Sequence, residues 1–320
     1  MMIVSLVNSL LVSVLLPTTS RSSVLLPTTP RAATAPSSRA PPPRLAVIVG
    51  GASASSQPPP LEQELEQSIV ACGEWLEQNG GRRYPSSPIT NASLFNALKG
   101  EHERPARRLI KRVEAAAAEL EASRPPLQLD AADADALASG CWLLKYSNAP
   151  EITNLAKLPL GLGLEKVYQR VSLGSGVVEN RAMIRHRFRL LRQVTRVVAR
   201  ATREPELGAP NRAGVPNAGN RINVRFMKVV VALRRVLFVP TPFLRIVARP
   251  NGPNEKEGRT PTLDLTYVSA TTRVSRGGDG SLFVLERRPE GEVAEPMEEL
   301  DAPIASGRGF DGTTGKIEKM

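Results

Sequence analysis

The chain has 320 residues, of which 42 are basic, 31 are acidic and 4% are aromatic. Its two cysteines exclude a disulfide framework and a cysteine-based structural zinc site, and its two histidines argue against a metal centre built from several histidines. The low aromatic content also disfavours a platform for single-stranded nucleic acid, because such platforms stack bases on aromatic side chains.

The net charge of +11 arises from one stretch of the chain. Residues 181–288 contain 22 basic and 7 acidic residues, whereas residues 61–180 contain 13 basic and 16 acidic residues. A basic surface of this kind attracts anions in general, including phosphate backbones, anionic lipid head groups and acidic proteins. The charge by itself leaves these three classes of partner open.

The first 60 residues have the composition of an organelle-targeting leader. They contain no Asp, Glu or aromatic residue, but 11 Ser, 10 Pro and 4 Arg, as is typical of plastid and mitochondrial transit peptides. The apolar run Ile3–Leu16 is shorter than the ~20 residues of a membrane span. We predict that residues 1–60 are a transit peptide, or a two-part leader for plastids with extra membranes, and that the mature protein has no transmembrane span.

Residues 61–125 carry the periodicity of helices. Leu65, Ile69 and Cys72 recur at helical spacing with acidic residues between them, and a second apolar stripe precedes the prolines at positions 125 and 126. The Asn79–Gly81 segment is a helix stop signal. This region is predicted to be a helical lead-in of two or three helices.

From Gly140 the period changes to two, which is typical of strands. Asp279-Gly280 is a strong hairpin signal, whereas Arg192–Arg203 fits either a helix or a strand. Seven or eight strands without long helices between them predict an antiparallel sheet, closed into a barrel or folded as a sandwich. The alternating segments include Trp142–Tyr146, Val167–Val171, Ile184–Leu190, Ile222–Phe226 and Leu263–Tyr267.

Four segments in order resemble a known family. They are GCWLLKYS from Gly140, VYQRV from Val167, NRINVRF from Asn220 and LDLTYVSATTRVSRGGDGSLFVL from Leu263. Together they are similar to the plastid lipid-associated proteins, also called fibrillins or plastoglobulins. The resemblance implies a lipocalin-like barrel in a plastid (chloroplast) that binds or coats lipid and has no catalytic centre.

The predicted architecture is therefore α+β: N-terminal helices (61–125) followed by a lipocalin-like antiparallel β-barrel (126–288) and an acidic disordered tail (289–320). The interior of a closed sheet of about eight strands is filled by side chains or holds one small ligand, and the sequence leaves both open. The residues predicted to face inward, as core or ligand contacts, are Trp142, Leu144, Tyr146, Phe188, Phe226 and Tyr267.

Arginines alternate with apolar residues after Ile184. If this segment is a strand, Arg185, Arg187 and Arg189 project to one side. A solvated strand face is the simplest interpretation. A contact surface for anionic lipid is the sharper hypothesis, because each Lys or Arg near such a surface contributes ~1 kcal/mol. Nucleic acid is disfavoured, since no helix-turn-helix or RNP motif accompanies the charge.

No sequence motif points to catalysis. The chain has neither a G-x-S-x-G elbow nor a phosphate-binding P-loop, so we predict no enzyme activity, no metal and no cofactor. The predicted function is a plastid lipid-associated protein that binds an apolar lipid or a prenylquinone, or coats plastoglobule or thylakoid lipid. The alternatives are a small-molecule carrier or assembly factor for quinone biosynthesis in the stroma, and a basic organellar protein associated with nucleic acid.

Overall fold

The computed structural model describes residues 59–81, 84–97, 103–155, 158, 161–248, 261–293 and 295–297, together with the backbone of residues 309–311 and 316–318. The leader predicted for residues 1–60 lies outside the described residues, apart from Pro59 and Pro60.

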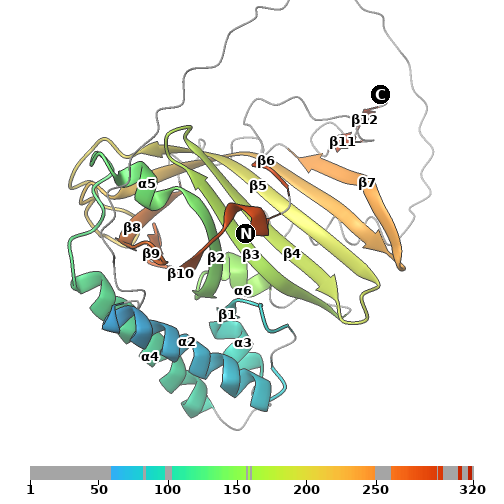
Figure 1. Cartoon of the computed structure of the whole chain (residues 1–320), viewed down its shortest axis with the longest axis horizontal. Coiled ribbons are helices and arrows are strands. Elements are labelled where there is room, and N and C mark those ends of the chain that lie inside the picture. Colours follow the sequence, from blue (N-terminus) through green and yellow to red (C-terminus); the bar gives the residue numbers. More distant parts are fainter. Residues whose placement is uncertain are drawn as a thin grey trace, which may run out of the picture.

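Helices and a large sheet form two parts of the molecule (Figure 1). The long helices α2 (Pro60–Gln78) and α4 (Glu103–Ala122) lie side by side near one end of the sheet. Three short helices connect the other elements: α3 (Asn91–Asn96), α5 (Ala134–Ala138) and α6 (Pro150–Leu155). The predicted α+β class and the helical nature of the lead-in are confirmed.

The described strands belong to one twelve-stranded sheet. Eight of them pair in a ring, in the order β6-β5-β4-β3-β2-β10-β9-β8, and β8 pairs back to β6. All of the ring pairings are antiparallel. The strands are β1 (Ile89–Thr90), β2 (Gly140–Ser147), β3 (Leu162–Ser172), β4 (Val177–His186), β5 (Leu191–Arg203), β6 (Arg221–Val236), β7 (Val239–Ala248), β8 (Thr262–Val268), β9 (Thr272–Gly277), β10 (Leu282–Arg288), β11 (Gly309–Asp311) and β12 (Lys316–Glu318).

Strands β5, β6 and β7 extend beyond what the sequence pattern indicates. The stretch that fitted either a helix or a strand is β5, while β6 continues to Val236 and turns directly into β7, a strand that the sequence pattern did not indicate. The continuous apolar run Val229–Leu233 hides the alternation in β6, because both faces of this part of the strand are buried.

A buried ion pair holds the seam between β6 and β8. Arg221 lies opposite Asp264 in the register. Its Nε donates to Asp264 Oδ1 at 2.6 Å and its Nη2 to Oδ2 at 3.0 Å, and its guanidinium also donates to the carbonyls of Ala209 and Val215. The adjacent Asn220 Nδ2 donates to the carbonyl of Leu265 at 3.0 Å. The seam therefore joins Asn220-Arg221 to Leu263-Asp264. These two pairs of residues belong to two of the segments that carry the family resemblance.

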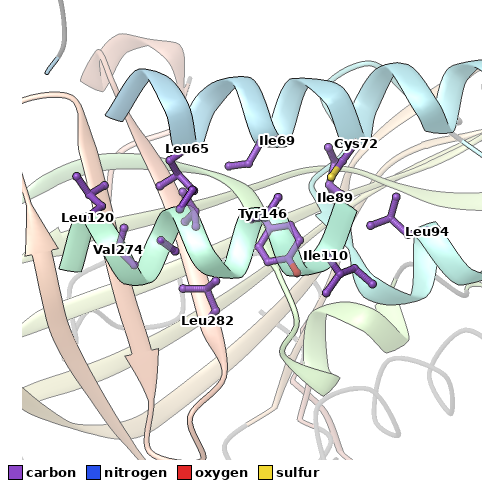
Figure 2. Packing of buried hydrophobic residues seen from close by; sticks show 14 of the residues in the cluster. Leu65, Ile69, Cys72, Ile89, Leu94, Ile110, Leu120, Tyr146, Val274 and Leu282 are labelled. Atoms are coloured by element: carbon purple, nitrogen blue, oxygen red, sulfur yellow. The ribbon is translucent and has the colours of Figure 1, made fainter. Parts of the chain in front are cut away.

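The two long helices pack on the outside of the ring (Figure 2). Their helically spaced apolar residues, such as Leu65 on α2 and Leu120 on α4, meet Val274 and Leu282 of the sheet. Burying one such aliphatic side chain contributes roughly 1.5–3 kcal/mol. This helix–sheet core is separate from the core inside the ring.

Two β-bulges correct the predicted direction of two tyrosines. In β2, Leu144 and Tyr146 pair with the consecutive residues Leu285 and Val284, so one extra residue turns Tyr146 away from the ring interior. The same shift in β8, between Leu265 and Tyr267, re-aims Tyr267. Both rings lie in the helix–sheet core instead of the interior.

The hydroxyl groups of these tyrosines bind the helical layer. Tyr146 donates to Asn91 Oδ1 at 2.7 Å, and Tyr267 donates to Glu62 Oε1 at 2.7 Å. Burial raises the pKa of Tyr267 to about 12, and the hydrogen bond to Glu62 adds to this shift. The two tyrosines therefore connect the sheet to the helices.

The first part of the predicted disordered tail is ordered and packed. Residues 290–292 form the 3-10 helix η1, and Val293 is buried beside Cys141 and Tyr168. Tyr168 donates to Glu292 Oε1 at 2.7 Å. Acidic residues 290, 292 and 295 thus find basic and hydroxyl partners on the outer face of β3 and β5, which composition alone did not indicate.

Candidate functional site

The inner face of the ring carries a mainly apolar core. By inner face we mean the side of the ring strands whose side chains form the cluster with Trp142 and Leu144, and both residues are buried there. The other fully or largely buried members from the strands are Leu162, Leu164, Val167, Val171, Val178, Ile184, Ala201, Ile222, Leu265, Val268 and Leu285.

Trp142 lies at one end of this core under two guanidinium groups. Its Nε1 donates to the carbonyl of Ala138 at 3.0 Å. The Cζ atoms of Arg287 and Arg273 lie 4.2 Å and 4.9 Å from the centroid of the indole ring. Arg287 donates to the carbonyls of Leu137 and Ser139, at the end of α5. Arg287 therefore ties β10 to the segment that precedes β2.

Arg273 is the unusual member of this group. It is 1% exposed, and its Nη2 donates to Gln169 Oε1, whose amide in turn donates to Asn180 Oδ1 at 2.8 Å. Its Nε has no hydrogen-bond partner, and neither does the hydroxyl of Ser275, two residues further along β9. Burial, followed by repulsion from Arg287, lowers the pKa of Arg273 to about 9.

The predicted row of arginines along one strand is not formed. Strand β4 ends at His186, so Arg187 and Arg189 lie in the turn that follows. Arg185 is on the strand and faces away from the interior, where its Nη1 pairs with Glu165 at 3.1 Å and its guanidinium lies 4.6 Å from the ring centroid of Tyr84. Arg185 therefore already has protein partners.

Cross-strand pairing produces a different row. Arg185 lies opposite Arg192 of β5, and Arg192 lies opposite Arg235 of β6. Like charges directly opposite one another on antiparallel strands are destabilising. Both Arg192 and Arg235 are exposed, and within the described part of the chain neither has an acidic partner. This row, unlike the predicted one, joins three strands.

Next to this row the sheet exposes large apolar side chains. Phe188, predicted to face inward, is 61% exposed in the β4–β5 turn, while Leu237 and Phe238 of the β6–β7 turn are 67% and 66% exposed. Val239 follows at 62%. The backbone N–H of Leu237 donates to the carbonyl of Leu190 at 2.7 Å, so the two turns are neighbours.

We name this surface the paired-turn end. Strands β4 to β7 carry it away from the helical layer, toward the lower right of Figure 1. Its cations Arg187 and Arg189 have no acidic partner among the described residues, and Arg187 lies over the Phe188 ring at 4.5 Å. The paired-turn end comprises Arg187, Phe188, Arg189, Arg192, Arg235, Leu237, Phe238 and Val239.

Phe226 lies apart from the cluster around Trp142. It is half-buried and packs with Val197, Val229 and Val231 in a small cluster of its own. Phe226 pairs with Ala199, two residues before Ala201 of the inner core, so it lies on the inner face of β6. The bulge between Phe226 and Lys228 keeps Val229 and Val231 on that face as well. Phe226 therefore faces inward, but in a cluster separate from the one around Trp142.

Other chemistry is not assembled in the described ranges. They contain no group of three or more His, Cys, Asp or Glu residues placed to hold a metal ion. Burial raises the pKa of Cys72 and of Cys141 to about 11, which opposes thiolate formation at neutral pH. Among the same residues, none of the helices combines the length and the hydropathy that a bilayer crossing requires.

Comparison with known proteins gives one result. The PAP_fibrillin family model matches residues 90–286, from the strand before α3 to the end of the ring. Neither the curated proteins nor the solved structures that were compared gave a match. The matched range includes the four segments that resemble this family.

Proposed function

The chain belongs to the PAP/fibrillin family, and from that premise we propose that it associates with anionic lipid surfaces of the plastid through the paired-turn end. Membership indicates a plastid lipid-associated protein of a generally structural, non-enzymatic family. We place it at the surface of plastoglobules or thylakoids, and we interpret the ring of eight strands as a lipocalin-like barrel. The return pairing of β8 with β6 supports that interpretation.

Strained backbone at the β6–β7 turn carries the proposal. Leu237 and Phe238 have φ angles of 47° and 72°, the left-handed values of a two-residue type I′ turn, for which Asn-Gly is preferred. Each non-glycine residue in this conformation costs roughly 1–2 kcal/mol. The protein therefore holds two large apolar side chains in solvent at an energetic cost, which is consistent with a contact role.

The charge of the paired-turn end complements anionic lipid. Arg187, Arg189, Arg192 and Arg235 surround the exposed apolar residues. Near an anionic membrane surface each cation contributes about 1 kcal/mol, and apolar side chains that enter the acyl boundary add roughly 25 cal/mol for each Å² buried. A mixed apolar and cationic tip fits the interface of a lipid layer better than it fits water.

Vesicle flotation tests the apolar contribution. The variant Leu237→Asn/Phe238→Gly supplies the residues that the turn prefers and removes both apolar side chains. We expect flotation with phosphatidylglycerol vesicles to fall at least tenfold while the melting temperature stays equal or rises. The matched control is Leu207→Ser/Val215→Ser, which removes two exposed apolar residues elsewhere and should float like the wild type. Equal flotation of the turn variant and the wild type would refute the proposal.

A second set of variants tests the charge. Gln at Arg187, Arg189, Arg192 and Arg235 should abolish the preference for phosphatidylglycerol over phosphatidylcholine, and 0.5 M salt should weaken wild-type binding because exposed charges are screened. Gln at the exposed α4 cations Arg104, Arg108, Lys111 and Arg112 removes the same charge at a distant place. If the first variant loses RNA binding and keeps vesicle binding, the surface serves nucleic acid instead.

A further inference from the structure

Three arginines are among the largest fully buried side chains of the described residues, but only two of them have an acidic partner. Arg181 donates to Glu179 and to the carbonyl of Pro296. Arg221 binds Asp264 through two hydrogen bonds. Arg273 makes no ion pair with any described residue, and the side chain that accepts from it is the neutral Gln169.

The open donors of this region face the interior. Arg273 lies opposite Leu285, a residue of the inner core, and Ser275 lies opposite Phe283, which packs against the same core. Residues i and i+2 of a strand share a face, so Arg273 Nε and the Ser275 hydroxyl point into the ring together. An unsatisfied buried charge is costly, and a ligand that accepted from both groups would remove this cost.

Solvent reaches part of this face. Gln169 on β3 and Asn180 on β4 share the inner face with buried core residues of their strands. Both are nevertheless only partly buried. The inward residues Phe283, Ala182 and Val224 are likewise incompletely covered. The region around Arg273 is therefore not sealed from the ring interior.

We propose that Arg273 and Ser275, with Gln169 beside them, form an interior site for the carboxylate of a long-chain acyl molecule. Arginine matches a planar carboxylate through paired N–H groups, and the hydroxyl of Ser275 is a further donor. The apolar inner face then accommodates the acyl chain. This inference goes beyond the proposed surface association by naming a class of lipid that the ring takes up.

The charge balance discriminates between lipid classes. A neutral prenylquinone or carotenoid leaves the guanidinium uncompensated, whereas a single carboxylate neutralises it. A fatty acid thus fits the site better than a neutral lipid does.

The position of the site also suits transfer from a lipid surface. Asn180, which binds Gln169, lies near the beginning of β4, and the other end of β4 leads into the paired-turn end. A carboxylate held at Arg273 therefore places its chain along strands that run toward the lipid-facing tip.

Matched ligands test the inference on the wild-type protein. Oleate and methyl oleate have the same chain but differ in charge, and each is titrated below its micelle concentration while the tryptophan fluorescence is followed. Since a hydrogen bond to a charged group is worth more than one to a neutral group, we expect oleate to bind at least tenfold more tightly than methyl oleate. Equal affinities, or no binding of either, would overturn the site.

Variants assign the preference to the named residues. Arg273→Met should keep the fold and bind oleate and methyl oleate equally, while Arg273→Lys and Ser275→Ala should each lose part of the preference. Arg212→Met, at an exposed position, is the control and should behave as the wild type. A well-folded Arg273→Met protein that still prefers oleate would contradict the assignment.

The two proposals fail separately. Leu237→Asn/Phe238→Gly should lose vesicle flotation and keep oleate binding, whereas Arg273→Met should float normally and lose the preference for oleate. If the turn variant floats like the wild type but oleate is still preferred, the interior site stands and the docking surface is wrong. If the turn variant loses flotation but oleate and methyl oleate bind the wild type equally, the docking surface stands and the interior site is wrong.

Discussion

The β6–β8 seam and the interior around Trp142 bury the same kind of side chain in opposite electrostatic settings. Arg221 and Arg273 are 2% and 1% exposed. At the seam a carboxylate, two carbonyls and a matched register satisfy Arg221. In the interior an indole ring and one amide are the partners of Arg273. The ion pair of Arg221 holds the seam of the ring. Arg273, in contrast, keeps a hydrogen-bond donor without a protein partner inside the ring.

The difference also separates stability from function. A residue whose partners are all supplied by the protein destabilises the fold when one partner is removed. A residue with unmet donors gives up little stability when it is replaced. Substitutions at the two places should therefore have very different effects.

Trp142→Ala should cause the largest loss of stability. The substitution empties the end of the inner core and removes the aromatic face beneath two guanidinium groups. Loss of a buried Trp costs roughly 3–5 kcal/mol, and lost cation–π contacts add to this. Urea unfolding measures the change. An unaltered unfolding midpoint would show that Trp142 does not support this end of the ring.

Asp264→Asn should be the next most damaging. It leaves Arg221 charged and buried at the seam, and breaking a buried ion pair by removing one partner costs about 3–5 kcal/mol. Urea unfolding again provides the measurement, and hydrogen exchange should increase first in β6 and β8. Protection lost uniformly over all strands would argue against a local seam.

Acidification should weaken the attachment of the helices to the sheet. Burial by itself raises the pKa of Glu62, but hydrogen bonds from Tyr267, Thr272, Thr271 and Ser269 outweigh it and lower the pKa below 4.5. The stability that Glu62 adds is therefore present above about pH 4.5 and is lost as the pH falls through its folded pKa.

The measurement for this prediction is the unfolding midpoint between pH 6 and pH 3. Wild-type stability should fall more steeply over this interval than that of Glu62→Gln, which cannot titrate at this position. Parallel curves for the two proteins would remove Glu62 from the acid response.

Arg273→Met should have the smallest effect on stability. It removes an unpaired buried charge, which is favourable, but leaves Gln169 without one hydrogen bond, so we expect a net change within about 1 kcal/mol. Parallel urea unfolding of this variant and of Asp264→Asn tests the comparison directly. A loss of several kcal/mol would mean that Arg273 is as well satisfied in the fold as Arg221.

Local pattern was sufficient for the regular parts of the molecule. Apolar residues at helical spacing predicted the layer of α2 and α4, because one face of each helix packs on the sheet. Alternation predicted β2, β3 and β8, and the Asp-Gly turn signal predicted the hairpin of β9 and β10. The continuous apolar run in β6, buried on both faces, obscured the β6–β7 hairpin. The strand predicted through Phe188 instead turned, and its aromatic ring became part of the surface.

The candidate sites were less accessible from the sequence. Bulges in β2 and β8 add one residue without altering composition, so the outward direction of Tyr146 and Tyr267 had no local signal. The row Arg185–Arg192–Arg235 depends on the register between strands. Arg273 lies in the segment from Leu263 that resembles the family. Nothing in that segment indicates that its guanidinium is buried without an acidic partner among the described residues.

The sequence by itself determined the family, the helical lead-in and the concentration of positive charge after residue 180, since each of these is written in local order or composition. Only the tertiary structure decided which of the arginines are neutralised. Arg221 meets an acid 43 positions away, and Arg273 meets an amide 104 positions away. Charge compensation is a property of distances in space, and those distances are set when the ring of strands closes.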